Sequence, residues 1–252
     1  MNVLVCVKRV PLTGGKIVLT DDERAISTRH LGFTVSPHEE CGAEEAVRLI
    51  EQHGGSSTVL TLGPPEAEEQ LRDMMALGID RAVHLVTDGS NEWDPQATAS
   101  AIVQAIRARP EPPDLILFGN ESADAGNYQV AIRVAHKLNL PVVTGVKGIT
   151  ATGGQLSCEQ EVPGGRNVYV VPTPAVVTVK EGLNLPRYPS VPGRLRAKRK
   201  PLDASTPTRP DPKLEMVKLT LPPGAGKQTE VLGNGADAAP AVVTMLDELG
   251  LL

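Results

Sequence analysis

The chain has 252 residues with 25 basic and 30 acidic side chains, and this net charge of −5 excludes the overall basic field expected of a nucleic-acid-binding protein. Because 40% of the residues are hydrophobic and only 2% are aromatic, the core must consist mainly of Val, Leu, Ile and Ala, which suits a parallel sheet covered by helices. No apolar run approaches the roughly 20 residues of a membrane helix, no signal peptide is evident, and the three cysteines form no CxxC pair, so we expect a cytoplasmic protein.

Strands and helices are expected to alternate along the first 145 residues. Short apolar runs predict buried strands, and apolar residues at three- and four-residue spacing predict helices. The predicted elements, strand and helix in turn, cover residues 3–7, 37–53, 58–62, 66–77, 82–86, 95–106, 115–118 and 130–138. This order is typical of an α/β domain with a doubly wound, mostly parallel sheet and helices on both faces.

The predicted helix that begins after residue 36 has a clear start signal. Ser36 is a favoured N-cap and Pro37 a favoured first helical residue. We predict that the acidic pairs Glu39–Glu40 and Glu44–Glu45 form a solvated face of this helix rather than an acid–base dyad. The charges of Lys8–Arg9 beyond the first strand are predicted to be solvated, with a partner or nucleotide contact as the alternative.

Residues 114–143 combine a buried strand, a loop of small and polar residues, and a helix start. In an open parallel sheet such a loop lies outside the carboxyl ends of the strands, where ligands bind. The unpaired N–H groups of the helix start favour an anion, typically phosphate. The alternative, which the pattern leaves equally open, is an ordinary connection in which Asp124 or Asn127 caps the helix.

After Pro141 the pattern becomes β-rich, with hairpin turns expected at Gly153–Gly154 and Pro163–Gly165. The segment 181–193 follows, and its prolines, Pro192 included, are expected to prevent a regular element there. The basic run 194–200 is predicted to be a short helix or strand. These residues suit either a solvated linker or an exposed loop that docks an acidic partner.

The remaining residues are rich in Pro, Gly, Ser, Thr and Asp up to about residue 239 and are predicted to form an extended arm. Because a long structureless stretch inside a compact domain is improbable, we expect this arm to lie across another subunit. Residues 241–252 resemble a short amphipathic helix. The chain is therefore divided into an α/β domain of residues 1–200 and a C-terminal arm and helix of residues 201–252.

Several motifs are absent from the sequence. No GxGxxG follows the first strand, and neither a GxxxxGK[ST] P-loop nor a GxSxG elbow occurs, so a standard dinucleotide fold, a P-loop NTPase and an α/β-hydrolase are not supported. The five histidines show no metal-ligand spacing, and His84 and His136 are predicted to be packing or surface residues. No metal site and no catalytic residue are predicted.

Five motifs in order resemble the β subunit of electron transfer flavoproteins, also called the FixA family, over nearly the full length of the chain. These motifs are Val5–Pro11, Ser36–Leu49, Ala76–Ala82, Gly119 with Ala123–Asp124 and Gln129–Val130, and Leu183–Pro189 with Ala197–Lys200. The resemblance implies an adenine-nucleotide α-hydrolase-like domain that forms a heterodimer with an α subunit. The α subunit holds the electron-carrying FAD, and the β subunit, which is not usually an enzyme by itself, buries an AMP.

In such a complex, electrons pass from flavin-dependent dehydrogenases through the FAD of the α subunit toward the respiratory chain, with a membrane-bound quinone oxidoreductase as a further partner. The resemblance leaves a second possibility open, because electron-bifurcating members hold FAD instead of AMP in the β subunit and oxidise NADH. A nucleotide-binding stress-type homodimer is a third interpretation. The arm after Pro201 and the loop around Leu183 argue against it, since such a protein needs neither.

The resemblance also implies site residues. The nucleotide contacts carried over by position are Cys6, Ser36, Pro37, His38, Glu39, Leu62, Ala123, Asp124, Asn127, Tyr128, Gln129 and Val130. The partner-docking loop carries over to Leu183, which matches the apolar anchor, and to Asn184, Pro186, Arg187 and Tyr188. The chain departs from the family where Ser36–Pro37–His38 replaces Asn-Pro-Phe, where Gly126 replaces an acidic residue and where Ala131 replaces a glycine. Glu39 would repel a phosphate unless its carboxylate points away.

Overall fold

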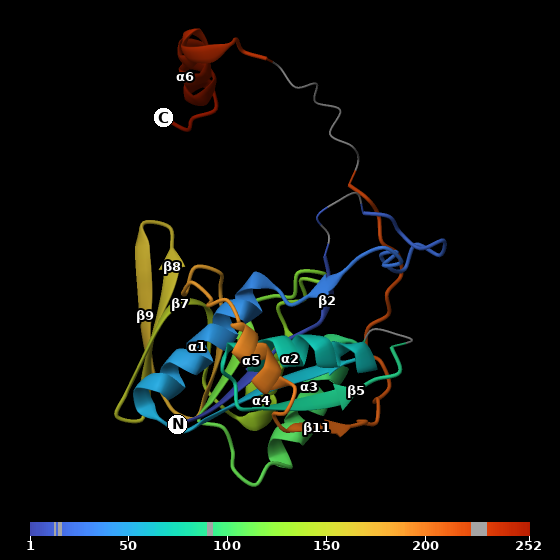
Figure 1. The fold of residues 1–252 in the computed structure, drawn as a ribbon. Helices are drawn as coiled ribbons and strands as arrows, with labels where there is room; N and C mark the ends of the chain where they lie inside the picture. The colour runs from blue at the N-terminus through green and yellow to red at the C-terminus, as the bar shows by residue number, and fades with distance from the viewer. Residues whose placement is uncertain (13, 15–16, 90–92, 223–230) are drawn as a thin grey trace.

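The computed structural model describes residues 1–12, 14, 17–89, 93–222 and 231–252. A nine-stranded sheet forms the centre of the molecule, in the order β11-β5-β4-β1-β6-β10-β7-β8-β9 (Figure 1). The strands are β1 (Asn2–Cys6), β4 (Ser56–Gly63), β5 (Arg81–Val86), β6 (Leu115–Gly119), β7 (Val142–Thr152), β8 (Gln155–Val162), β9 (Gly165–Pro172), β10 (Ala175–Val179) and β11 (Leu202–Ser205). Pairing is parallel from β11 to β7 and antiparallel from β7 to β9, which confirms the predicted mostly parallel sheet with a β-rich addition.

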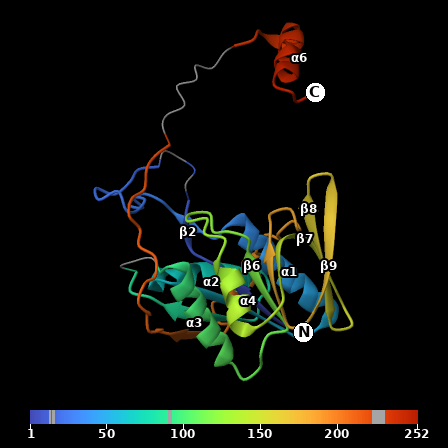
Figure 2. The same ribbon diagram turned by 180° about the vertical axis from the view of Figure 1, so that it is seen from behind.

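Helices cover both faces of the sheet, as the predicted doubly wound pattern requires. One face packs against α1 (Pro37–His53), α2 (Glu68–Leu77) and α5 (Val191–Ala197). The opposite face, turned toward the viewer in Figure 2, packs against α3 (Pro95–Arg107) and α4 (Val130–Leu138). A 3₁₀ turn, η1 (Pro65–Ala67), precedes α2, and a small antiparallel ladder joins β2 (Val10–Pro11) to β3 (Phe33–Thr34).

The sequence of β1 explains why the sheet is covered on both sides. Successive side chains of a strand point to opposite faces, so an apolar run must be buried on both. Val3 and Val5 belong to the core under α1 and α2, whereas Leu4 and Cys6 belong to the core under α3 and α4. Val3, Leu4 and Val5 are fully buried. Each contributes roughly 1.5–3 kcal/mol relative to an exposed side chain.

Two segments differ from the predictions. Pro192 lies inside α5, so the expectation that the prolines of residues 181–193 prevent any regular element was wrong there. The reason is its position in the first helical turn, where a missing N–H costs nothing, behind the N-cap Ser190. Residues 202–205, expected to belong to the arm, instead form β11 and extend the sheet by pairing with β5.

The arm beyond β11 runs along the body before it leaves it. The carboxylate Oδ2 of Asp94 accepts hydrogen bonds from the backbone N–H groups of Lys213 and Leu214, at 2.6 and 3.3 Å. The N–H of Leu219 donates to the carbonyl of Glu23. Residues 223–230 of the predicted arm lie outside the described residues.

The chain then forms a 3₁₀ turn, η2 (Gly235–Ala238), and α6 (Ala239–Glu248), which corresponds to the C-terminal helix predicted for 241–252. In both views α6 stands apart from the sheet (Figures 1 and 2). Among the residues with described positions, we find no helix that combines the length and the apolarity needed to cross a bilayer.

Candidate functional site

The strand order reverses between β1 and β6, and this point defines the candidate site. From β1 the chain passes through α1 to β4 on one side and later returns through α3 to β6 on the other side of β1. In doubly wound sheets, ligands bind in the crevice outside the carboxyl ends of the strands at such a reversal. Residues that follow β1 and β6, together with the N-terminus of α1, therefore line the candidate site.

Glu39 joins the start of α1 to the end of β1. Its Oε2 accepts a hydrogen bond from the backbone N–H of Ser36 at 3.1 Å, and its Oε1 accepts one from the N–H of Lys8 at 3.0 Å. The first bond belongs to a capping box, in which the third helical residue reaches back to the N-cap. The Oγ of Ser36 is placed toward the N–H of Glu39 as the other half of the box requires, but it makes no hydrogen bond there. Glu39 is buried, so the prediction of a solvated face was wrong for this residue. Its carboxylate is directed to the chain's own backbone.

Burial sets the ionisation of Glu39. Removal from water raises the pKa of its carboxyl to about 8, although hydrogen bonds from the N–H groups of Lys8 and Ser36 oppose this rise. At neutral pH the side chain is therefore largely protonated and adds little negative charge to the helix N-terminus. The repulsion of a phosphate that the sequence predicted for Glu39 is weakened accordingly.

Gly119, at the end of β6, lets the loop approach α1 closely. A Cβ at this position would lie 2.8 Å from the Cγ of Glu39 and 3.3 Å from the Cβ of His38, so a side chain would force the two segments apart. Asp124 in the following loop forms an ion pair with Lys8, whose Nζ lies 2.8 Å from Oδ2. The structure thus brings the ends of β1 and β6, the loop and the start of α1 together.

The expectation that Lys8 and Arg9 are simply solvated is wrong for both residues. Lys8 pairs with Asp124, and the guanidinium carbon of Arg9 lies 3.3 Å from the centroid of the Phe33 ring, a cation–π contact. Sequence reasoning left Lys8 out of the carried-over nucleotide contacts. Its position directly beyond a buried strand at the reversal point is the signal that could have included it.

The loop before α4 is exposed and locally strained. Tyr128 has φ = 56°, a left-handed conformation that is rare for a bulky residue, and its side chain is exposed. The N-cap of α4 is Gln129, whose side-chain oxygen accepts hydrogen bonds from Arg133, so the suggestion that Asp124 or Asn127 caps this helix was wrong. The other carried-over loop residues are placed as follows: Ala123 is exposed, and Asn127 and Val130 are half-buried.

Two of the carried-over contacts do not direct their side chains into this crevice. Cys6 is buried in the core between the sheet and α3, and burial raises the pKa of its thiol well above the usual range. Leu62, near the end of β4, packs partly against the same core. Cys6 can therefore meet a ligand only through its backbone, whereas the side chain of Leu62 stays partly exposed.

The start of α1 leaves buried polar atoms that suit a ligand. Within the described part of the chain, no hydrogen-bond partner is present for the Oγ of Ser36 or for the Nδ1 of His38, and both atoms are shielded from water. A buried polar atom without a partner is costly and requires an explanation, such as a ligand. Pro37 lies between them as the exposed first helical residue. A phosphate, ribose or base could satisfy these atoms.

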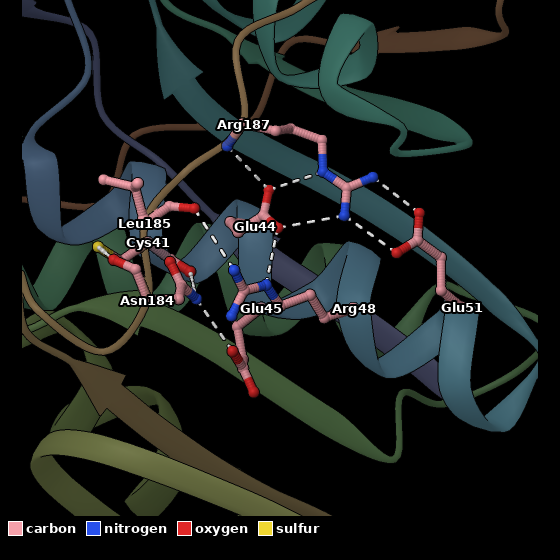
Figure 3. A network of polar contacts seen from close by, with 8 residues as sticks. All are labelled: Cys41, Glu44, Glu45, Arg48, Glu51, Asn184, Leu185 and Arg187. Atoms are coloured by element: carbon pink, nitrogen blue, oxygen red, sulfur yellow. Dashed lines mark hydrogen bonds and ion pairs between the residues drawn. The ribbon is translucent and has the colours of Figure 1, made fainter.

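The predicted docking loop lies against α1 and α2, away from this crevice. Leu183 packs partly against the core, so it is less available than an exposed anchor. Asn184 and Arg187 turn their side chains toward α1, as Figure 3 shows, and Pro186 is half-buried. Tyr188 is 96% exposed.

Further exposed apolar side chains lie beside Tyr188. Leu185 is 84% exposed, Val191 is 73% exposed and Leu195 is 60% exposed. No acidic residue occurs between positions 187 and 200, and this segment carries the basic side chains Arg187, Arg194, Arg196, Lys198, Arg199 and Lys200. Arg187 and Arg194 are paired with carboxylates outside this segment, and the Nζ of Lys200 donates to backbone carbonyls. The surface from Leu185 to Lys200 is therefore apolar, with exposed cations at Arg196, Lys198 and Arg199.

Comparisons with known proteins agree with this architecture. A family model described as the electron transfer flavoprotein domain matches residues 25–210. The electron transfer flavoprotein subunit beta of Bacillus subtilis is 34% identical over 254 residues, which cover 98% of this chain and 97% of the relative. The subunit beta of Syntrophomonas wolfei is 34% identical over 88% of this chain and 86% of its own length.

A third relative, the electron transfer flavoprotein subunit beta of Bradyrhizobium diazoefficiens, is 31% identical over the whole of both chains. Identities of this size, sustained from end to end, include the arm as well as the α/β domain. The protein therefore belongs to the family of electron transfer flavoprotein β subunits.

Proposed function

We propose that this chain is the β subunit of a heterodimeric electron transfer flavoprotein, in which it holds AMP at the β1–β6 reversal point and an α subunit carries the FAD. The carrying observation is the pair of buried polar atoms, the Oγ of Ser36 and the Nδ1 of His38, at the start of α1. A nucleotide would supply the missing hydrogen-bond partners, and the helix N-terminus favours its phosphate.

The residues at this site are suited to holding a nucleotide rather than to reacting with one. Glu39 caps α1, Asp124 is neutralised by Lys8, and Ser36 has no base in the structure that contacts its hydroxyl among the described residues. We therefore assign no catalytic residue to this chain. The FAD of the α subunit supplies the redox chemistry, and the nucleotide here braces the end of the sheet.

The arm and α6 support assembly with the α subunit. Val242, Val243 and Met245 on α6 and Leu249 at its C-cap are exposed, although an amphipathic helix is stabilised mainly when its apolar face is covered. The arm is anchored to the body at Asp94, so it can present α6 to a neighbouring subunit from a fixed starting point. We propose that the α subunit covers this helix.

We further propose that flavin-dependent dehydrogenases dock on the surface from Leu185 to Lys200. Exposed apolar side chains can fill a pocket of the partner, and the exposed cations Arg196, Lys198 and Arg199 would accelerate association with an acidic surface. Because Leu183 is partly buried, the contact is assigned to Leu185, Tyr188, Val191 and Leu195 rather than to Leu183 as the anchor. Electrons would then pass through the FAD of the α subunit toward the respiratory chain, with a membrane-bound quinone oxidoreductase as acceptor.

The test is co-purification with the α subunit, followed by denaturation and chromatography of the released nucleotides. One FAD and one AMP per heterodimer would support the proposal. Two FAD and no AMP would replace it with the electron-bifurcating alternative, in which this chain holds the flavin that NADH reduces. Purification of a stable homodimer that does not bind the α subunit would contradict both.

A further inference from the structure

The loop 184–188 is fastened to α1 by side chains from both segments (Figure 3). The guanidinium of Arg187 bridges two carboxylates of α1 that lie about two helical turns apart. Its Nε and one Nη donate to Glu44 at 2.9 and 3.1 Å, and its two Nη atoms donate to Glu51 at 2.7 and 3.0 Å. The backbone N–H of Arg187 also donates to Glu44, at 3.2 Å. A planar guanidinium suits such double recognition, which an ammonium group cannot reproduce.

Glu44 is the buried centre of this network, with only 3% of its side chain exposed. Besides Arg187, the Nε of Arg48 donates to it at 2.8 Å, so its two oxygens together accept four hydrogen bonds. Burial by itself would raise the pKa of this carboxyl, but the hydrogen bonds from Arg187 and Arg48 hold it below the ordinary value. A buried charge is tolerated only when it is paired and hydrogen-bonded in this way.

A second attachment lies at Asn184. Its Nδ2 donates to the carbonyl of Cys41 at 3.0 Å and to the carboxylate of Glu45 at 2.9 Å. The thiol of Cys41 donates in return to the carbonyl of Asn184, at 3.6 Å. Glu45 is buried, and burial raises its pKa. The loop is thus held at both ends, with Leu185 between the two attachments and Tyr188 directly after the second.

We propose that Asn184 and Arg187 are positioning residues, which hold the loop on α1 in the form that docks a partner and do not themselves contact that partner. This inference rests on the proposed docking function and separates the roles of residues that the sequence assigned together. Four hydrogen bonds of the Arg187 guanidinium are already directed to Glu44 and Glu51, whereas Leu185 and Tyr188 are exposed. A loop that is ordered in advance loses less conformational entropy on binding, which favours both affinity and association rate.

The first experiment is hydrogen–deuterium exchange on the protein purified with its α subunit. The variant Arg187→Lys keeps the charge but cannot bridge two carboxylates, and Arg166→Lys, which alters an exposed ion pair to Glu159 on the β8–β9 hairpin, is the matched control. We expect amide exchange in residues 184–189 to accelerate about tenfold in Arg187→Lys but not in the control. The loop should open locally more often once it is no longer bonded to α1, whereas exchange in β10 should not change because the core stays folded. Equal exchange of this loop in the wild type and in Arg187→Lys would overturn the proposal.

The second experiment measures electron transfer from a reduced flavin-dependent dehydrogenase to the same proteins. A positioning role predicts that Arg187→Lys and Tyr188→Ala each raise the KM for the dehydrogenase several-fold without changing kcat, and that the double variant is little worse than Tyr188→Ala. Fully additive losses would show that Arg187 contacts the partner directly and would overturn the proposal. If no dehydrogenase reduces the wild-type complex, the docking function fails, and the exchange result still decides whether Arg187 positions the loop.

Discussion

The start and the middle of helix α1 differ in whether their buried polar side chains find hydrogen-bond partners. At its N-terminus the Oγ of Ser36 and the Nδ1 of His38 are buried without partners among the described residues. About two turns later, the Glu44 carboxylate accepts four hydrogen bonds. Beside it the Nδ2 of Asn184 donates to Glu45, while the Oδ1 of Asn184 is buried without a partner among the described residues. A carboxylate whose acceptor positions are all filled fixes one geometry, whereas a buried atom without a partner requires an explanation, and for the start of α1 we propose a ligand. If the proposed function holds, one helix supports both a rigid loop contact and a nucleotide site.

The substitution Glu44→Ala should have the largest effect, because it removes the carboxylate that Arg187 and Arg48 share. We expect the free energy of unfolding to fall by about 2–3 kcal/mol, because Arg187 and Arg48 lose their shared partner but are exposed enough to regain water. Chemical denaturation followed by circular dichroism measures this loss. As a control, Glu68→Ala removes an exposed ion pair with Arg72 and should change stability far less.

Low pH should weaken the same hydrogen bonds, because protonation removes the charge of Glu44. The folded-state pKa of Glu44 lies below its ordinary value of 4.5, so its contribution to stability is present above that pH and is lost as the pH falls through the folded pKa. In Glu44→Ala this part of the acid destabilisation should be missing. Identical acid profiles for the wild type and the variant would show that Glu44 does not carry the effect.

Two N-cap serines, Ser36 and Ser190, allow the role of the unbonded Ser36 hydroxyl to be tested against a hydroxyl that caps its helix. The Oγ of Ser36 is placed toward the N–H of Glu39 as in a capping box but makes no hydrogen bond to it, whereas the Oγ of Ser190 accepts one from the N–H of Gly193 at 3.1 Å. Ser36→Ala should weaken AMP binding about tenfold, equivalent to about 1.4 kcal/mol, with little change in the stability of the nucleotide-free protein. Ser190→Ala should instead lower stability by about 1 kcal/mol and leave AMP affinity unchanged. Calorimetry and thermal denaturation distinguish these outcomes, and equal affinities in all three proteins would argue against a ligand at Ser36.

A smaller effect concerns the pH dependence of Glu39. Because burial raises its pKa from 4.5 to about 8, the folded state binds the extra proton between these values, and stability should decrease as the pH rises through this range. Above about pH 8 the ionised carboxylate should also weaken AMP binding by repelling the phosphate. Calorimetric titrations from pH 6 to about 9 test this, and an affinity that rises with pH would contradict it.

The smallest expected effect is on the arm. One oxygen of Asp94 accepts from the N–H of Ala97 to cap α3, and the other accepts from Lys213 and Leu214 of the arm. Asp94→Asn retains only one acceptor oxygen, so we expect amide exchange around residues 213 and 214 to accelerate several-fold. Helix α3 itself should remain protected, and slow exchange of the arm in the variant would show that Asp94 does not anchor it.

The sequence predicted the alternating elements of the first domain because each depends on local patterns. The apolar run at Leu115–Phe118, the N-cap and proline at Ser36–Pro37 and the glycines after His53 all act within a few residues. Strand β11 was missed because Leu202–Ser205 is a short segment with one large apolar side chain. It becomes a strand only because β5 leaves an open edge beside it.

The features of the candidate site likewise fall into those that the sequence predicted and those that only the structure located. The sequence by itself determined the doubly wound order, the start of α1 and the loop after β6, and therefore the crevice at the reversal point. Only the tertiary structure decided that Glu39 turns to its own backbone, that Leu183 packs partly inward and that Glu44 is buried against Arg187. The last two residues are 143 positions apart, so no local pattern records their contact. From sequence alone, an acidic helical face is predicted to be solvated, because burying a carboxylate is costly. Groups from distant parts of the chain can offset that cost, and only the folded structure shows that they do.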